Sequence, residues 1–533
     1  MTHEKNENRR YGIGASLAAG AVAALLLSSV HAGCGSDKAT TGSAGTSGSA
    51  GTGSAGVTGA AGTGSAGDTG AAGTGSAGVT GAAGTGSAGS TGAAGTGGTA
   101  CKDEEVNVTA DITTNTTWPC NTYVLTKKIH ITNGATLTIA AGSTIFGNGT
   151  TQNPAALIST REGKLVAVGT ATAPIVFTSY APVGGRAPGD TFAGVVMLGK
   201  AKLNTGTCSG DGDPATPACD APGFLQSTIE GIDPTDPRAP FGGTDDTHNC
   251  GELKYVRIEF AGYVIGAGNE LNGLSMGACG SQTKVSYIQV HRGFDDGIEM
   301  FGGTASLDHI LISGSVDDGL DWDNGWTGKV QFLIIHQAYG QGDKGFEADN
   351  LAADELAVPR SNPEIWNATL IGETGRIGMH LRRGTHYKLR NFIVQGFTGG
   401  AVDVDAVKAG NSPMADWPTM MSIENSVFFN NPLAKTEVAG GVDGGAGTDN
   451  DMGFDETAAI SDAARLNATT ADPMLGSIAI AAPNYVPGNA AAVMGKATPA
   501  APFDVTATYA GAVAPGTAPA AAWYAGWTSF PEK

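Results

Sequence analysis

The sequence predicts an all-β protein built as a parallel β-helix, in which coils of short strands stack along one axis. Three stretches repeat the order acid, any residue, Gly, apolar, acid, apolar: DDGIEMFGG at 295–303, DDGLDWDNG at 317–325 and DKGFEADN at 343–350. Their glycines are 22 and 26 residues apart. A recurrence of this length is typical of proteins that repeat one structural unit.

Two families of strand-like segments alternate through the second half of the chain. The first family lies at 253–260, 285–291, 307–313, 330–336, 365–371, 389–395 and 423–429. The second lies at 273–276, 297–300, 319–322, 345–348, 378–381 and 401–404. A β-sandwich would place strands about 8–12 residues apart, whereas these longer intervals fit one coil per repeat. No helical pattern long enough for a βαβ unit separates the strands.

Residues 1–33 are expected to be a signal peptide, because a basic start precedes an apolar stretch from 13 to 30. The sequence Ala-Gly-Cys at 32–34 resembles a bacterial lipobox, which favours lipidation of Cys34 and a membrane anchor. The alternative is cleavage after Ala32, which would give a secreted protein. We therefore expect an exported lipoprotein of the outer membrane or cell surface.

Residues 34–100 follow the lipidation site as a low-complexity linker. GTGSAGVTGAA occurs at 51–61 and 73–83, with near copies at 62–72 and 84–94. Such a stretch has too little apolar area to offset the entropy of ordering, so we expect a disordered tether.

Six further cysteines predict disulfide bonds in an oxidising compartment. Pairing by sequence order gives Cys101–Cys120, Cys208–Cys219 and Cys250–Cys279. Other pairings stay open, because the connectivity of six cysteines does not follow from sequence.

The folded body is expected to begin at 101, with the β-helix spanning 101–435. Alternating apolar and polar residues at 122–147, 155–179 and 192–203 predict its first strands, and 204–250 reads as a loop excursion. Residues 436–533 are expected to be an acidic loop and a C-terminal segment of the same body. Its aromatic residues predict that the tail folds back over a coil edge.

The formal net charge of −20 argues against nucleic acid as a partner, because the phosphate backbone would be repelled. The charge is compatible with cations or neutral glycans. We expect a monomer.

The second strand family predicts a column of polar side chains on one outer face. Side chains alternate between faces of a strand, and stacked coils lie about 4.8 Å apart. The residues that follow the inward apolar positions are Ser275, Glu299, Asp321, Glu347, His380 and Asp403. A parallel column at the preceding turn contains Asp295, Asp296, Asp317, Asp318 and Asp343.

Three interpretations of these acids compete. In the first, they cap turns and are solvated. In the second, they hold a divalent cation, most readily Ca²⁺, because clustered carboxylates suit a hard cation. The candidate metal ligands are Asp295, Asp317, Asp323, Asp343 and Asp349.

In the third interpretation the acids cleave a glycan. Carboxylates on adjacent coils would stand close to the separation of a retaining glycosidase pair, and those two coils apart close to that of an inverting pair. A polyuronate lyase would instead need Ca²⁺ and a basic residue. The candidate catalytic residues are Asp296, Glu299, Asp318, Asp321, His380 and Arg382.

Several other residues have simpler structural explanations. Arg382 and Arg383 are expected to pair with carboxylates of neighbouring coils, and the tryptophans Trp322, Trp326 and Trp366 to pack rather than stack on sugars. Asn367, Asn391 and Asn425 recur at one strand position and predict an internal Asn ladder with a structural role. His291, His309 and His336 are expected at non-equivalent positions, which makes a metal site among them a weak hypothesis.

The chain resembles the right-handed parallel β-helix proteins of the pectin-lyase-like superfamily. The segments that carry the resemblance are NGATLTIAAGSTIFG (133–147), LKYVRIEFAG (253–262), DDGIEMFGG (295–303), DDGLDWDNG (317–325), LRRGTHYKLRNFIVQG (381–396) and YAGWTSF (524–530). More narrowly, they are similar to a group of exported bacterial lipoproteins. The resemblance implies the fold but no single activity, because the superfamily includes lyases, hydrolases, adhesins and inert scaffolds.

The sequence therefore predicts a non-catalytic, envelope-anchored binding or adhesion protein with a glycan or protein partner. A polysaccharide lyase or glycoside hydrolase that uses the acidic residues is the alternative. No cofactor is expected apart from Ca²⁺.

Overall fold

The computed structural model describes residues 101–533 except for 103, 151, 207–224, 267–268, 407–409 and 436–450. The expected signal peptide, Cys34, the tether, the Cys208–Cys219 pair and most of the acidic loop lie outside the described residues. Within the described part of the chain, no helix is long and apolar enough to cross a membrane.

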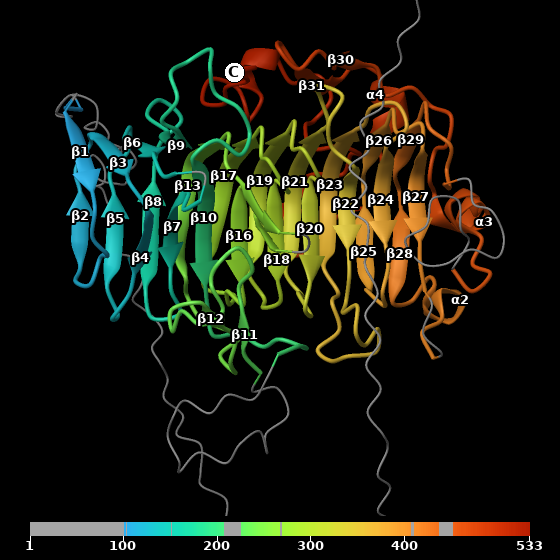
Figure 1. Cartoon of the computed structure of the whole chain (residues 1–533). Coiled ribbons are helices and arrows are strands. Elements are labelled where there is room, and N and C mark those ends of the chain that lie inside the picture. The colour runs from blue at the N-terminus through green and yellow to red at the C-terminus, as the bar shows by residue number, and fades with distance from the viewer. Residues whose placement is uncertain are drawn as a thin grey trace, which may run out of the picture. The chain divides into compact units, whose positions relative to one another are not determined.

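Parallel strands in two stacked sheets form the body, which confirms the predicted parallel β-helix (Figure 1). The larger sheet contains β1 (Glu105–Val108), β2 (Thr116–Trp118), β3 (Thr122–Leu125), β5 (Thr136–Ile139), β6 (Thr144–Gly147), β8 (Lys164–Val168), β9 (Ile175–Ser179), β13 (Gly251–Glu259), β17 (Lys284–His291), β19 (Ser306–Ser313), β21 (Lys329–His336), β23 (Glu364–Ile371), β25 (Tyr387–Arg390), β26 (Ile393–Gln395), β28 (Met421–Glu424) and β29 (Val427–Phe429). The second sheet contains β4 (Lys128–Ile131), β7 (Ala155–Ser159), β10 (Phe192–Leu198), β16 (Leu274–Gly277), β18 (Ile298–Phe301), β20 (Leu320–Asp323), β22 (Lys344–Ala348), β24 (Ile377–Leu381) and β27 (Gly400–Val404).

Short elements decorate this body. Three antiparallel pairs are β11 (Ser227–Thr228) with β12 (Pro240–Phe241), β14 (Tyr263–Gly266) with β15 (Asn269–Leu271), and β30 (Leu475–Ser477) with β31 (Asn484–Pro487). The described helices are α2 (Pro413–Asp416), α3 (Glu456–Ser461) and α4 (Ala490–Val493), with 3₁₀ turns η3 (Ala463–Arg465) and η4 (Pro519–Ala521).

The repeated glycine of the acidic motif is explained by coil stacking. A Cβ atom on Gly297 would lie 2.8 Å from the carbonyl oxygen of Gly319, and one on Gly319 would lie 2.6 Å from that of Gly345. A methyl group does not fit at such a distance from backbone, so each coil needs glycine where the next coil's carbonyl approaches.

The inside of the coils is one continuous apolar core that runs from Val108 to Ile460. Trp322 and Trp326 lie fully buried in it, so these two tryptophans pack, as predicted, and are not available to a sugar. Disulfide bonds join Cys101 to Cys120 and Cys250 to Cys279, as expected from sequence order.

The long strands of the larger sheet bend at one column of left-handed residues. Their φ angles lie between 49° and 62° at Tyr255, Tyr287, His309, Phe332, Asn367, Asn391 and Asn425. Rings stack in the first half of the column, with 4.5 Å between the centroids of Tyr255 and Tyr287. Asparagine, which tolerates this conformation well, occupies the second half.

The C-terminal segment, 473–533, lies along the flank of the coils and runs back toward their N-terminal end (Figure 1). The Asn367 amide donates to the carbonyls of Ala507 and Tyr509, and the amide of Asn391 donates to that of Ala497. Asn367 and Asn391 therefore hold this segment on the outside of the coils. The prediction of an internal Asn ladder was wrong in its location, because these two amides bond the covering segment. At the last coil, Phe454 and Ile460 of the α3 region enter the core, so the coil end itself is covered by α3 and not by the tail.

Candidate functional site

The predicted outer column of polar side chains is confirmed by the strand register. Ser275, Glu299, Asp321, Glu347, His380 and Asp403 are successive partners across β16, β18, β20, β22, β24 and β27. The alternation of strand side chains was enough to predict this, because one residue of slip would have turned every apolar neighbour outward. We call these six residues the acidic column.

The acidic column is largely buried, which differs from the interpretation that its acids are solvated. The exposed fraction is 2% for Asp403, 6% for His380 and 8% for Glu299, while Asp321 and Glu347 are half-buried. One cause is the loop excursion after β10. Its residues Ile229, Ile232 and Phe241 form an apolar cluster with side chains of β7, β10 and β18, next to the start of the column.

The turn before the column uses carboxylates as backbone caps, which agrees with the turn-capping interpretation. Asn272 accepts a hydrogen bond from the backbone N–H of Asp296 at 3.2 Å. Asp296 accepts in turn from the N–H of Asp318 at 3.0 Å, and Asp318 accepts from that of Lys344 at 2.6 Å. Each side chain thus satisfies the N–H of the next coil, so Asp296 and Asp318 have a structural role whatever else they do.

Among the described residues, the cations that pair with the site's carboxylates lie in its C-terminal half. The Lys344 ammonium lies 2.6 Å from Asp343, 2.8 Å from Glu347 and 3.4 Å from Asp318. Burial alone would raise the pKa of Glu347, but Lys344 and Arg382 lower it below its usual 4.5. This half is a network of buried ion pairs.

Arg382 and Arg383 belong to the same network. Arg382 pairs with Glu347 and lies 2.8 Å from Asp349, and Arg383 lies 2.7 Å from Asp349. The expected pairing of both arginines with carboxylates is confirmed. Both guanidinium groups therefore pair with the Asp349 carboxylate, which makes Asp349 a poor candidate for a metal ligand.

The N-terminal half of the site holds carboxylates that face other carboxylates. Burial, followed by the charge of Asp317, raises the pKa of Asp295 to about 8. Burial and neighbouring acids also raise the pKa values of Glu299 and Asp321 well above their usual range. The Asp321 Oδ1 atom is buried and has no hydrogen-bond partner among the described residues. These groups would gain from a bound cation or from protonation.

The carboxylates form four clusters whose ligand atoms lie within 4.8 Å of one another. The clusters are Asp295, Asp296 and Asp317; Asp296, Glu299 and Asp321; Asp317, Asp318 and Asp343; and His380, Asp403 and Asp405. Of the expected metal ligands, Asp295, Asp317 and Asp343 belong to such clusters, whereas Asp323 and Asp349 do not. The expected catalytic acids Asp296, Glu299, Asp318 and Asp321 all do.

The fourth cluster joins His380 and Asp403, which the sequence analysis placed in the outer column, to Asp405, which it did not select. His380 Nε2 lies 2.7 Å from Asp405 and 3.6 Å from Asp403, and Lys435 lies 2.8 Å from Asp403. The alternation that identified Asp403 also predicts an outward side chain two residues later, at Asp405. Glu230 is different, because it hydrogen-bonds Glu299 from the loop excursion and no sequence pattern identifies it.

The prediction that the three histidines occupy non-equivalent positions was wrong for His291 and His336, although it holds for His309. His291, Ser313 and His336 are successive register partners, so two of the three histidines share one column. They stand two coils apart, which hides their equivalence in the sequence. Both are covered by the C-terminal segment, since His291 bonds the Pro531 carbonyl at 2.8 Å and His336 bonds the Tyr485 hydroxyl at 3.0 Å.

The charges of the site decide which chemistry suits it. Lys344 and Arg382 have raised pKa values, because the attraction of surrounding carboxylates outweighs their burial. A general base that acts near neutral pH needs a lowered pKa, so neither cation suits proton abstraction. The carboxylates of the N-terminal half can instead bind a hard cation or keep a proton.

Comparison with known proteins gives a family but no named relative. No curated protein and no solved structure matched the chain. Residues 110–470, more than half of the chain, match a family model described as the pectate-lyase-like β-helix domain. This match agrees with the stacked parallel strands, and the chain belongs to the family of pectate-lyase-like β-helix domains.

Proposed function

We propose that this chain is an exported, lipid-anchored β-helix protein that binds a surface glycan without cleaving it, with Ca²⁺ held by carboxylates of the acidic column and of the turn before it. The predicted signal peptide and lipidation of Cys34 support export and anchoring. Two disulfide bonds are in keeping with an oxidising compartment.

The observation that carries the calcium proposal is the cluster of Asp296, Glu299 and Asp321. Their ligand atoms lie within 4.8 Å of one another, and Ca²⁺ takes oxygen ligands at about 2.3–2.6 Å, so one ion could contact all three. The buried Asp321 Oδ1 has no hydrogen-bond partner among the described residues, so a cation beside it would satisfy this atom. A bound ion that keeps water ligands could exchange them for sugar hydroxyl or carboxylate oxygens.

Two features argue against cleavage. A glycosidase needs an acid and a second carboxylate that both reach the bond, but only Asp321 of the cluster is half-buried, and Glu299 is 8% exposed. A lyase needs a base, and the nearby cations Lys344 and Arg382 are each held by more than one carboxylate. Binding without cleavage needs neither a general acid nor a general base.

A glycoside hydrolase remains the second candidate because of one observation. Burial and the neighbouring acids raise the pKa of Asp321, which favours the protonated form that a general acid needs, and a second carboxylate lies beside it. This candidate requires the glycan to reach the buried cluster.

Calcium binding is tested by calorimetric titration and thermal unfolding of the full chain. Ca²⁺ should raise the unfolding temperature and chelator should reverse the rise, because an ion that binds only the folded state stabilises it. Glu299→Gln and Asp321→Asn should abolish the effect, whereas Glu104→Gln, an exposed carboxylate outside the site, should retain it. Identical unfolding in Ca²⁺ and in chelator would refute the metal.

Cleavage is tested separately on a panel of neutral and acidic polysaccharides. The proposal expects retention of glycan by the protein and no shortened product, with and without Ca²⁺. Product release that disappears in Asp321→Ala would overturn the binding proposal in favour of the hydrolase.

A further inference from the structure

The C-terminal end of the acidic column places a histidine among carboxylates. His380 lies on β24, and Asp403 lies on β27, the last strand in the order of the smaller sheet among the described residues. Asp405 follows Asp403 by two residues and joins the same cluster. The three residues are buried, with exposed fractions of 6%, 2% and 6%. The cluster therefore spans the last two coils of this sheet.

The distances within the cluster fit the ligands of one ion. His380 Nε2 lies 2.7 Å from Asp405 Oδ2 and 3.6 Å from Asp403 Oδ2. A tetrahedral ion such as Zn²⁺ binds nitrogen and oxygen at about 2.0–2.2 Å, so its ligands stand roughly 3.3 Å apart. Shifts of roughly half an ångström would bring the three atoms to that spacing.

The other nitrogen of the His380 ring is an independent sign of a ligand. The hydrogen bond to Asp405 places a proton on Nε2, while the buried Nδ1 has no hydrogen-bond partner among the described residues. Glu347 Oε1 lies 3.9 Å from Nδ1, which is too long for a hydrogen bond. An ion on Nε2 would replace the proton there, and Nδ1 would carry the ring proton on the side of Glu347. Metal-bound histidines usually face a carboxylate in this way.

A lysine holds the place of a cation in this cluster. The Lys435 ammonium lies 2.8 Å from Asp403 Oδ2, and its side chain is 20% exposed. With a neutral imidazole, Asp403 and Asp405 carry one more negative charge than Lys435 supplies. A divalent ion would balance both carboxylates, and the long side chain of Lys435 could turn its charged end to water.

The donor set selects the class of ion. Carboxylates alone suit Ca²⁺ or Mg²⁺, whereas an imidazole nitrogen beside carboxylates suits Zn²⁺, Fe²⁺ and related transition ions. The cluster of Asp296, Glu299 and Asp321, proposed above for Ca²⁺, contains no nitrogen donor. The two clusters should therefore prefer different ions.

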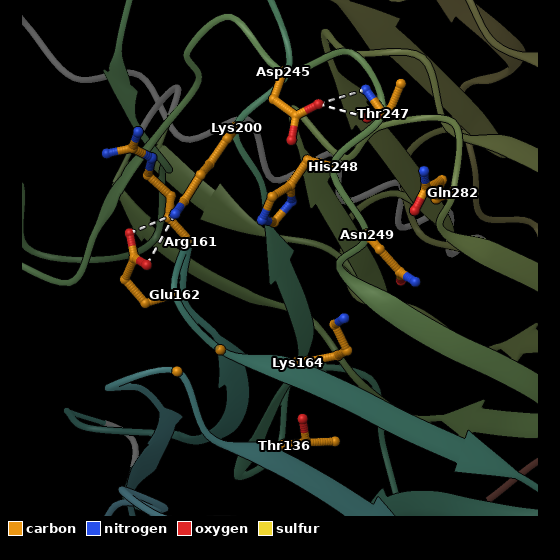
Figure 2. A pocket seen from close by; sticks show the side chains of 12 residues that line it. Thr136, Arg161, Glu162, Lys164, Lys200, Asp245, Thr247, His248, Asn249 and Gln282 are labelled. Atoms are coloured by element: carbon orange, nitrogen blue, oxygen red, sulfur yellow. Dashed lines mark hydrogen bonds and ion pairs between the residues drawn. The ribbon is translucent and has the colours of Figure 1, made fainter.

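A second histidine with acidic neighbours shows the contrast. His248 lines a cavity of about 300 Å³ together with Glu162 and Asp245 (Figure 2). Asp245 bonds Thr247 at 2.7 Å and Glu162 pairs with Lys200 at 2.8 Å, as the dashed lines in Figure 2 show. Among the residues that the structure describes, these carboxylates form no ligand cluster with His248. Proximity of acids to a histidine is thus not sufficient, and His248 serves as a control.

We propose that His380, Asp403 and Asp405 bind one divalent transition ion, with Zn²⁺ as its type, which displaces the Lys435 ammonium from Asp403. Three protein ligands leave the fourth position of a tetrahedral ion to water. The ion would tie β27 to β24 and so hold the last coil of the smaller sheet. The site is independent of the proposed function, because it uses other residues and needs no glycan.

The test titrates the full chain with Zn²⁺ by calorimetry in an excess of Ca²⁺, which keeps the hard-cation cluster out of the measurement. One Zn²⁺ should bind per chain, and hydrogen exchange of 400–405 should slow, because the ion binds only the folded coils. Glu299→Gln and Asp321→Asn, which should abolish the effect of Ca²⁺, should leave Zn²⁺ binding unchanged. The two metal proposals can therefore fail separately.

Variants then locate the ion. His380→Gln should weaken Zn²⁺ binding by more than about a hundredfold, because even residues that only orient a ligand contribute about 10–100-fold. Lys435→Gln should tighten Zn²⁺ binding at least about tenfold, since it removes one competing charged contact and keeps all three ligands. His248→Gln is the matched control and should change nothing.

Four results would each overturn the proposal: no Zn²⁺ binding to the unaltered chain, displacement of Zn²⁺ by the excess of Ca²⁺, undiminished binding in His380→Gln, or no gain in Lys435→Gln. A cluster that is only a structural ion pair predicts the first of these. The unaltered chain and Lys435→Gln decide the outcome even if His380→Gln does not fold.

Discussion

Replacement of Lys344 by methionine should destabilise the protein by leaving buried carboxylates without their cation. Asp318 and Glu347, whose side chains are 3% and 18% exposed, lose an ammonium at 3.4 Å and 2.8 Å. Removal of one member of a buried ion pair costs about 3–5 kcal/mol, and Arg382 still neutralises part of the charge, so we expect a loss of about 3 kcal/mol at pH 7. Asp343 adds little, because its side chain is 52% exposed.

The assay is chemical unfolding monitored by tryptophan fluorescence, in chelator so that a divalent cation cannot replace the lysine. Lys329→Met is the matched control, since Lys329 pairs with Glu364 at 3.0 Å on the surface, where such a pair contributes about 0–1 kcal/mol. The loss in Lys344→Met should shrink as the pH falls, because Lys344 helps to hold the pKa of Glu347 below its usual value and protonation removes the unpaired charge.

Equal losses in the Lys344→Met and Lys329→Met variants would refute the reasoning. A loss in Lys344→Met that stays constant from pH 7 to pH 4 would show that lost packing, and not unpaired charge, destabilises the variant.

Three further predictions concern the covering segment and the coil stacking. Burial lowers the pKa of His291 and His336 to about 4, so the folded state is favoured with both imidazoles neutral. Their contribution to the stability of the folded state is complete above about pH 6.5 and falls by up to about 3 kcal/mol each as the pH drops toward 4. Hydrogen exchange of 473–533 should rise over that pH range, and it should rise less in His336→Gln. Asn367→Ala should lower the free energy of chemical unfolding by about 2–4 kcal/mol, because it removes two hydrogen bonds and places alanine in a left-handed backbone conformation. Asn367→Gly loses the same hydrogen bonds but avoids the backbone strain, so its loss should be smaller. Gly319→Ala should destabilise measurably in thermal unfolding, since its Cβ would lie 2.6 Å from a carbonyl oxygen, whereas Gly185→Ala, with its nearest contact at 3.5 Å, should be neutral.

The fold and the register of the site followed from the sequence because both depend on local, repeated features. Strand alternation places Leu320 inside and Asp321 outside, and the recurrence of the motif repeats that choice in each coil. Glycine at Gly297 and Gly319 marks where adjacent coils touch. Sequence reasoning could therefore predict the acidic column residue by residue.

Only the tertiary structure decided how exposed to solvent each residue of that column is and which charges surround it. The loop that carries Ile229 and Glu230 covers the start of the column through contacts that have no sequence period. The same holds for the C-terminal segment, which buries His291 and His336 from far along the chain. Burial sets the cost of an isolated charge and hence the pKa values. The sequence by itself thus determined which carboxylates stand side by side, while packing between distant segments decided which of them are neutralised and which still need a cation.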